Sequence, residues 1–177
     1  MIGLDGIARL LPRRRPMLLV DRIVEAVPGE RITAVKAVTG NEPCYLGLPF
    51  GTPAERLAYP PALLVESWGQ TAGLLASMAA GDAPEAVMLL GGVSGVRFHR
   101  PVHPGVALEH RIRVALAMND TTVFEGETLV DGERVLSVGR MTIAYRRWDT
   151  IPIEGFGALR SPAPAAEAAA IPAQRDR

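Results

Sequence analysis

The stretch of residues 59–80 constrains the fold more than any other part of the sequence. Two prolines open it, which suits the first turn of a helix, and no proline interrupts the residues that follow. Its large apolar residues are spread round the whole helix, which is typical of a helix buried on all sides. Gly69 and Gly73 add a strip of small residues for close packing against a sheet. The stretch therefore predicts one long, buried central helix.

One charged residue, Glu66, stands within this apolar helix. Burying an unpaired carboxylate costs several kcal/mol unless the group is protonated or finds a partner. Gln70 follows one turn later on the same face, where its amide could hydrogen-bond Glu66. Both polar residues also argue against a membrane-spanning helix. Two interpretations stay open, a solvated glutamate at the helix edge and a functional carboxylate at a site.

The composition sets the class of protein. A length of 177 residues fits one domain, and 19 basic against 19 acidic residues leave no general preference for nucleic acid or an anionic membrane. The single cysteine, Cys44, excludes an internal disulfide and favours a reducing cytoplasm. The first residues include Asp5 and lack a long apolar run, so we expect no signal peptide.

Strand patterns flank the central helix on both sides. Two strands are predicted before it and about four antiparallel strands after it; the segments are 17–27, 31–39, 87–98, 106–118, 122–130 and 134–145. One buried helix with a mostly antiparallel sheet indicates an α+β fold in which the sheet curls round the helix. We expect a single domain over residues 1–150 and a loose, Pro/Ala-rich tail over 151–177.

The remaining polar residues that could form a site are expected to have structural roles. Asp5 is expected to cap a short first helix. His99, His103 and His110 are expected to be surface or hydrogen-bonded side chains, with His110 exposed. Cys44 is expected to be a small packed residue. No phosphate-binding glycine loop, C-x-x-C or H-E-x-x-H occurs, so we predict neither a metal nor a cofactor.

Four motifs together resemble a known enzyme family. They are L-L-P-R-R-R-P-M-L-L-V-D-R (10–22), N-E-P (41–43), P-P-A-L-L-V-E-S-W-G-Q-T-A-G (60–73) and V-R-F-H-R-P-V-H-P-G (96–105). In this order, over residues 4–146, the chain resembles the 3-hydroxyacyl-[acyl-carrier-protein] dehydratases of fatty-acid synthesis. The resemblance implies the hot-dog fold, dimers with sheets joined edge to edge, and two active sites at the subunit interface.

The resemblance also implies a reaction and two catalytic groups. The substrate would be a 3-hydroxyacyl thioester on the phosphopantetheine arm of an acyl carrier protein. A histidine in a G-H-F-P-G loop takes the proton beside the thioester carbonyl, and a carboxylate from the other subunit protonates the leaving hydroxyl. Backbone N–H groups at the helix start stabilise the enolate oxygen. Glu66 matches the carboxylate, Gln70 matches the family's glutamine, and the Ala62 N–H remains as a candidate enolate donor.

Three departures separate this chain from the family pattern. The loop reads G-L-P-F-G-T-P (47–53), so Leu48 stands where the histidine is expected, and leucine cannot accept a proton. Pro61 replaces a glycine and removes one candidate N–H donor. The loop is also about four residues longer, through residues 54–57. General-base catalysis is worth ~10²–10⁴-fold and one oxyanion donor roughly 10²–10³-fold, so a homodimer should be a very poor dehydratase.

Several functional interpretations follow from these departures. The chain could lend Glu66 to a related hot-dog partner that supplies the histidine, as a heterodimer in fatty-acid, polyketide or polyene assembly. It could instead be a non-catalytic acyl-binding or scaffolding subunit, or catalyse thioester hydrolysis with Glu66 activating water. Arg14, Arg15 and Arg100 could meet an acidic carrier protein or remain solvated. Trp68 is expected in the core or the dimer seam, where it could shorten an acyl tunnel.

Overall fold

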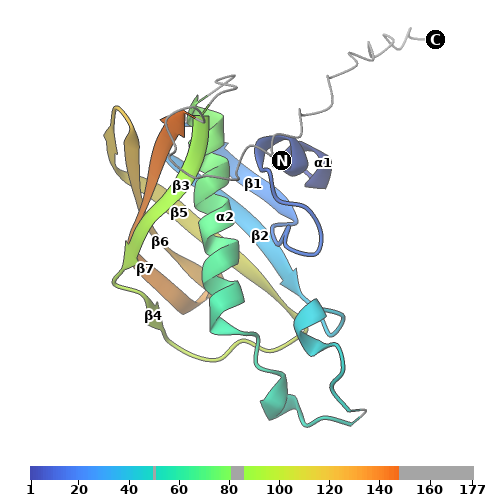
Figure 1. The fold of residues 1–177 in the computed structure, drawn as a ribbon. Helices are drawn as coiled ribbons and strands as arrows, with labels where there is room; N and C mark the ends of the chain where they lie inside the picture. Colours follow the sequence, from blue (N-terminus) through green and yellow to red (C-terminus); the bar gives the residue numbers. More distant parts are fainter. Residues whose placement is uncertain (50, 81–85, 148–177) are drawn as a thin grey trace, which may run out of the picture.

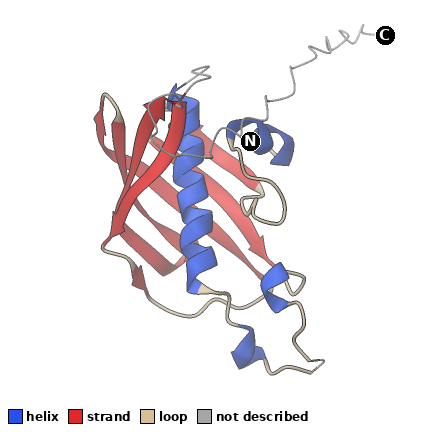
Figure 2. Ribbon diagram, in the orientation of Figure 1, coloured by secondary structure: helices blue, strands red, loops and turns tan. Residues whose placement is uncertain are grey.

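An antiparallel sheet curves round one long helix in this computed structural model, which describes residues 1–49, 51–80 and 86–147 (Figures 1 and 2). The elements in chain order are α1 (Leu4–Leu10), β1 (Arg22–Val27), β2 (Arg31–Val38), η1 (Pro43–Tyr45), η2 (Ala54–Leu57), α2 (Pro61–Ala80), β3 (Ala86–Ser94), β4 (Arg97–Phe98), β5 (Val106–Met118), β6 (Thr121–Val130) and β7 (Glu133–Arg147). This arrangement confirms the predicted α+β class and the hot-dog fold.

The sheet is antiparallel throughout and has the strand order β1-β2-β5-β6-β7-β3, with β4 pairing beside β7. The helix α2 is inserted in the chain between β2 and β3, so the sheet is assembled from segments on both sides of it. In this order β3 forms one edge of the sheet. Its exposed apolar side chains include Leu90, which is 64% exposed.

Alternation along the strands separates the two faces of the sheet, as expected for a sheet with one packed face. On β5, Leu108, His110 and Ile112 are buried, while Arg111 and Arg113 between and after them are exposed. The predicted wet and packed faces of this strand are therefore confirmed. The packed face meets α2 in one contiguous core.

The central helix is packed as its sequence predicts. Trp68 is 0% exposed and belongs to the core, together with Leu64, Leu74 and Leu75. Of the two glycines expected to pack against the sheet, Gly69 does so, since an added Cβ would lie 3.4 Å from Met141 on β7. Gly73 does not: an added Cβ there would lie 3.4 Å from a methyl of Leu11, so this glycine permits the close approach of the segment that follows α1. The burial of this helix on most sides explains why its apolar residues show no single stripe.

The structure corrects two predicted strand boundaries and one predicted helix cap. Residues 17–21 form an irregular segment instead of the start of β1, and its backbone groups bond to a side chain on α2. The predicted strand 87–98 is divided into β3 and β4 at Gly95, which has a φ of 66°. Asp5 does not cap α1: the N-cap is Gly3, and Asp5 lies in the first turn. The predicted tail, 151–177, lies outside the described residues.

His110 contradicts its prediction. It was expected to be exposed because charged residues flank it, yet its side chain is 0% exposed on the packed face of β5. Its Nδ1 shares a hydrogen bond of 2.8 Å with the Thr128 hydroxyl on β6. Burial, with a smaller contribution from the nearby Lys36 charge, lowers the pKa of His110 from 6.5 to about 3. The imidazole is therefore neutral at physiological pH.

Candidate functional site

Glu66 lies in the second turn of α2, where its side chain is half-buried. The carboxylate is 34% exposed in the single chain, which lies between a solvated glutamate and a fully buried one. Its Oε1 accepts a hydrogen bond of 2.9 Å from Nε2 of Gln70, which confirms the expected contact one helical turn away. No hydrogen bond from the described residues reaches Oε2. One oxygen is thus held while the other remains available.

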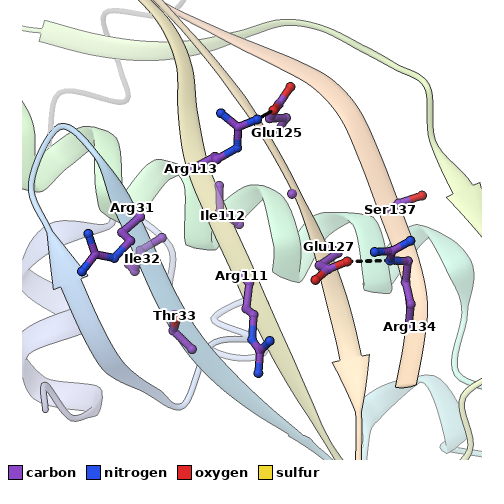
Figure 3. A pocket seen from close by; sticks show the side chains of 11 residues that line it. Arg31, Ile32, Thr33, Arg111, Ile112, Arg113, Glu125, Glu127, Arg134 and Ser137 are labelled. Carbon is purple, nitrogen blue, oxygen red and sulfur yellow. Dashed lines mark hydrogen bonds and ion pairs between the residues drawn. The ribbon is translucent and has the colours of Figure 1, made fainter. Parts of the chain in front are cut away.

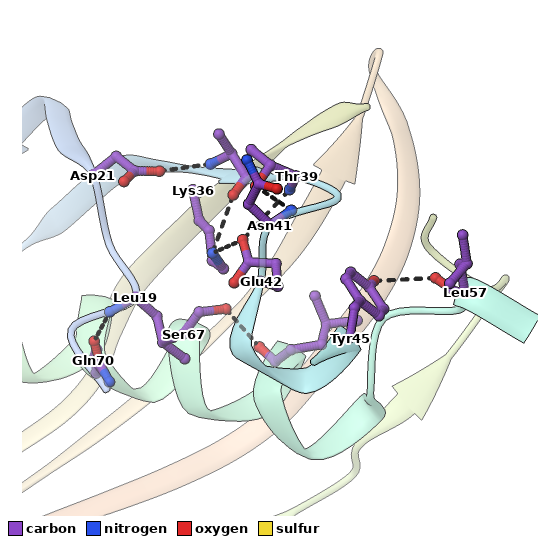
Figure 4. Close-up of polar contacts among 12 residues, drawn as sticks. Leu19, Asp21, Lys36, Thr39, Asn41, Glu42, Tyr45, Leu57, Ser67 and Gln70 are labelled. Carbon is purple, nitrogen blue, oxygen red and sulfur yellow. Dashed lines mark hydrogen bonds and ion pairs between the residues drawn. The ribbon is translucent and has the colours of Figure 1, made fainter. Parts of the chain in front are cut away.

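Gln70 connects Glu66 to the segment that precedes β1. Gln70 is 5% exposed, and its Oε1 accepts a 2.9 Å bond from the Leu19 N–H (Figure 4). Its Nε2 also donates 2.7 Å to the Met17 carbonyl. Both donors and the acceptor of the amide are used, so its orientation is fixed. The irregular 17–21 segment therefore buttresses the carboxylate through this one side chain.

Arg13 is the second residue that contacts Glu66. Its Nε lies 3.5 Å from Oε1 of Glu66, in an ion pair whose side chains are 57% and 34% exposed. The sequence indicated a basic cluster at 13–15 but not which arginine faces the helix. Arg14 instead donates to the carbonyls of Leu11 and Arg13 and so stabilises the fold of its own loop.

The start of α2 lies on the same helix as the carboxylate. Pro61 is the first helical residue, and the N–H groups of Leu63 and Leu64 both donate to the Pro60 carbonyl. Pro61 itself offers no N–H, whereas Ala62 does. Both residues are exposed. The first turn of a helix carries positive partial charge, so the Ala62 N–H can interact with a developing anion.

Leu48 lies in the loop between η1 and η2, and 41% of it is exposed. The loop extends away from the sheet beyond the start of α2 (Figure 1). Residues 54–57, which are expected from the sequence to lengthen the loop, form the short 3-10 turn η2, and the Tyr45 hydroxyl donates 3.0 Å to the Leu57 carbonyl. The insertion is therefore tied back to the base of the loop.

A buried ion pair anchors this loop and was not anticipated from the sequence. Nζ of Lys36 donates 2.8 Å to Oε1 of Glu42, and the two side chains are only 5% and 10% exposed (Figure 4). The ammonium also lies 5.5 Å from the centre of the Tyr59 ring, a cation–π distance. The available signal was a lysine inside the apolar run A-V-K-A-V shortly before an acidic residue. Through these contacts, Lys36 on β2 meets Glu42 at the start of the loop and Tyr59 just before α2.

The remaining predicted residues lie apart from Glu66 in their contacts. Arg100 donates 3.2 Å to the Val130 carbonyl and pairs with Glu133 at 3.3 Å. Arg15 is exposed in the basic cluster. Trp68 is wholly buried, and its Nε1 has no hydrogen-bond partner within the described chain. Burial and the adjacent Glu42 charge raise the pKa of the Cys44 thiol, which disfavours the nucleophilic thiolate.

A hollow of about 610 Å³ lies on the opposite face of the sheet from α2 (Figure 3). Its charged lining is arranged as ion pairs, Arg113 with Glu125 and Arg134 with Glu127. A smaller cavity of about 120 Å³ includes Arg100 and His103. Glu66 lines neither of these two cavities.

Two further findings concern site types. Within residues 1–49, 51–80 and 86–147, no three His, Cys, Asp or Glu side chains are grouped closely enough to hold a metal ion. In the same residues, no helix combines the length and apolar character needed to span a membrane. His99, which was expected from the sequence to be a surface or hydrogen-bonded histidine, shares a 3.0 Å hydrogen bond with the Ser137 hydroxyl.

Solved structures share this fold. A chain of the dehydratase heterocomplex ApeI:P from Xenorhabdus doucetiae superposes with a TM-score of 0.66 at 19% identity, covering 81% of this chain and 92% of that one. A mutant thioesterase from Pseudomonas aeruginosa gives 0.59 at 17% identity, covering 82% and 94%. At these identities the likeness shows the fold alone.

Sequence comparison is more specific. The FabA-like domain family matches residues 11–139. The 3-hydroxyacyl-[acyl-carrier-protein] dehydratase FabZ of Syntrophotalea carbinolica is 39% identical over 129 residues, covering 73% of this chain and 85% of that protein. FabZ of an Anaeromyxobacter species (strain K) is 40% identical over 149 residues, covering 83% and 93%. With the fold and the motif order in agreement, this chain belongs to the FabZ-type 3-hydroxyacyl-[acyl-carrier-protein] dehydratase family.

Proposed function

We propose that this chain is one subunit of a heteromeric dehydratase that removes water from 3-hydroxyacyl thioesters carried on an acyl carrier protein. Glu66 would supply the acid, and a related hot-dog subunit would supply the histidine base. The observation that carries this proposal is the oriented Glu66 carboxylate, held at Oε1 by Gln70, in a chain whose loop offers Leu48 in place of a base.

The proposed division of work follows the chemistry of the elimination. The partner's imidazole removes a proton from C2, and the electrons pass through an enolate to form the C2–C3 double bond. The bond from C3 to the hydroxyl breaks, and protonated Glu66 gives its proton to that oxygen, which leaves as water. The Ala62 N–H at the start of α2 would stabilise the enolate oxygen. No cofactor is needed for these steps.

The sheet edge supports association with a second hot-dog chain. β3 pairs with β7 on one side and ends the sheet on the other. Leu89, Leu90 and Val93 on this strand are 39%, 64% and 43% exposed. An apolar edge strand of nine residues favours pairing with another strand. A partner joined here would extend the sheet and bring two central helices into one dimer.

The carrier protein and the pathway belong to the same proposal. Arg14 and Arg15 lie in an exposed basic loop whose next residues hold Gln70, so they suit an acidic carrier that delivers its arm to Glu66. A fatty-acid or polyketide pathway would supply the carrier-bound 3-hydroxyacyl substrate. Trp68 on α2 would limit the depth of an acyl tunnel.

The decisive experiment reconstitutes the chain with a hot-dog protein that retains G-H-F-P-G. Dehydration of a carrier-bound 3-hydroxyacyl chain is measured for each protein alone, for the pair, and for the pair carrying Glu66→Gln. We expect the pair to be active and the variant pair to lose that activity. A matched variant, Glu55→Gln in η2, removes an exposed carboxylate away from α2 and should not change the rate.

The other interpretations give different results in this assay. Equal activity of the unmodified pair and the pair carrying Glu66→Gln would leave a scaffolding role and reject the acid. Release of free acid from the thioester, lost in the Glu66→Gln variant, would indicate hydrolysis. Full dehydratase activity of the unpaired chain would reject the need for a borrowed histidine.

A further inference from the structure

The contacts of Glu66 converge on one of its two oxygens. Gln70 donates 2.9 Å to Oε1, and the guanidinium of Arg13 approaches the same oxygen at 3.5 Å. A carboxylate held by a single bond can rotate about its Cγ–Cδ bond and exchange its oxygens, because this terminal torsion is broad. A second contact at the same oxygen opposes that exchange.

Arg13 also differs from Arg14 in the contacts that its guanidinium makes. The Arg14 guanidinium is engaged by the Leu11 and Arg13 carbonyls, whereas Arg13 donates no hydrogen bond to a described residue. Its nearest described ionic partner is Glu66, on an element more than fifty positions away in the chain. The 13–21 segment thus reaches Glu66 twice, directly through Arg13 and indirectly through the Gln70 amide.

We propose that Arg13 is a further positioning residue of this site: with Gln70 it fixes Oε1 of Glu66, so that Oε2 is the oxygen presented to the substrate's 3-hydroxyl. The inference rests on the proposed function of Glu66. It adds that the basic loop acts on the reaction through the carboxylate, in addition to any contact with a carrier protein.

A positioning role and a structural role of Arg13 predict different effects of its removal on the rate and on the stability of the fold. An ion pair as exposed as Arg13–Glu66 contributes little to stability. Its loss should leave folding almost unchanged. Misalignment of a catalytic group can nevertheless lower a rate by ~10²-fold. Arg13→Ala should therefore reduce kcat by about 10–100-fold with little change in KM, while the urea midpoint of unfolding stays close to the original value.

The test uses the reconstituted heteromeric complex and a matched control. Arg13→Ala is compared with Arg9→Ala, which removes an exposed arginine paired with Asp5 at 4.0 Å on α1. Arg9→Ala should not slow dehydration. Arg13→Lys should recover part of the rate, because lysine keeps the charge without the planar fork. Added guanidinium ion should partly rescue Arg13→Ala and leave Arg9→Ala unaffected.

A second measurement makes the inference independent of turnover. The carbon-13 resonance of the Glu66 carboxyl, assigned with Glu66→Gln, should move in Arg13→Ala and remain in place in Arg9→Ala. An unmoved resonance in Arg13→Ala would overturn the contact. If Glu66→Gln abolishes dehydration while Arg13→Ala retains the full kcat, the positioning role is rejected and the proposed function stands. If Glu66→Gln retains full activity, both are rejected.

Discussion

The ammonium of Lys36 and the carboxylate of Glu42 form a 2.8 Å ion pair that is almost completely removed from solvent. The same carboxylate oxygen lies 3.4 Å from the Thr39 N–H, and the ammonium donates 3.0 Å to the Ala37 carbonyl. These bonds join the end of β2 to the entrance of the long loop. The pair therefore fixes the position from which the loop leaves the sheet.

Removing one member of this pair should destabilise the fold strongly. Lys36→Met leaves the Glu42 carboxylate buried without a partner of opposite charge, and such changes cost about 3–5 kcal/mol. The double variant Lys36→Met/Glu42→Gln removes both charges and should recover part of that loss. Urea unfolding of the two single variants and the double variant measures the coupling. Equal stability of Lys36→Met and the unmodified chain would contradict a buried pair.

Stability should fall on acidification because of His110. The folded chain keeps this imidazole neutral down to a pKa of about 3, while the unfolded chain takes up a proton near 6.5. Between these values the unfolded state binds one more proton, so stability decreases as pH falls, with a slope of up to about 1.4 kcal/mol per pH unit. Denaturant unfolding at a series of pH values measures the slope. His110→Asn should flatten it, and His99→Asn, at an exposed histidine, should not.

Restoring a histidine to the loop should give the unpaired chain some dehydratase activity. Leu48→His places an imidazole where the motif comparison expects the family's histidine, and general-base catalysis is worth ~10²–10⁴-fold. Mass spectrometry of the carrier-bound product detects the loss of water. Leu48→Ala should stay inactive, and Leu48→His/Glu66→Gln should lose what Leu48→His gains. Activity that survives this second substitution would point to a different acid.

Restoring the missing N–H at the start of α2 should increase the rate further. Pro61→Gly and Pro61→Ala each return a backbone donor, and a donor to an enolate oxygen is worth up to roughly 10²–10³-fold. The increase should appear in the heteromeric complex and in the Leu48→His chain. Because alanine supplies the donor without the flexibility of glycine, a gain in only the glycine variant would attribute the effect to flexibility. Pro53→Ala, in the loop, is the matched control.

A charge on the sheet edge should prevent association. Leu90→Lys introduces a cation on β3 at a position that is 64% exposed in the single chain, and edge lysines oppose strand pairing. Sedimentation velocity should then show a shift toward single chains. Leu116→Lys makes the same change at a 53% exposed leucine on β5, away from the β3 edge, and should leave association intact. Loss of association in both variants would place the interface elsewhere.

The sequence predicted the elements with strong patterns. The central helix was found because its apolar residues and opening prolines are local signals, and the alternation of β5 gave the two faces of the sheet. The contact between Glu66 and Gln70 followed from helical spacing alone. The family motifs then supplied the candidate acid and identified Leu48 and Pro61 as departures from the pattern.

The residues that were missed depend on contacts between distant segments. Arg13 and the 17–21 segment meet α2 only after folding, and no local pattern distinguishes Arg13 from Arg14 or Arg15. His110 was misjudged because its neighbours are charged, although strand alternation places it on the same face as Leu108 and Ile112. The half-buried Glu66 likewise contacts Arg13 from a distant segment, and helical periodicity does not determine that contact.

Hydrogen bonds hold the base of the long loop between η1 and α2, and this has a practical consequence. Tyr45 is bonded to the Leu57 carbonyl, and the Tyr59 N–H donates 2.7 Å to the Val102 carbonyl, so both sides of the loop are held before α2 begins. Doubling the length of a flexible loop costs only about 0.6 kcal/mol in closure entropy. A peptide tag or fluorescent reporter grafted between η1 and η2 should therefore leave the central helix undisturbed, and this loop is where related chains can most readily gain or lose residues.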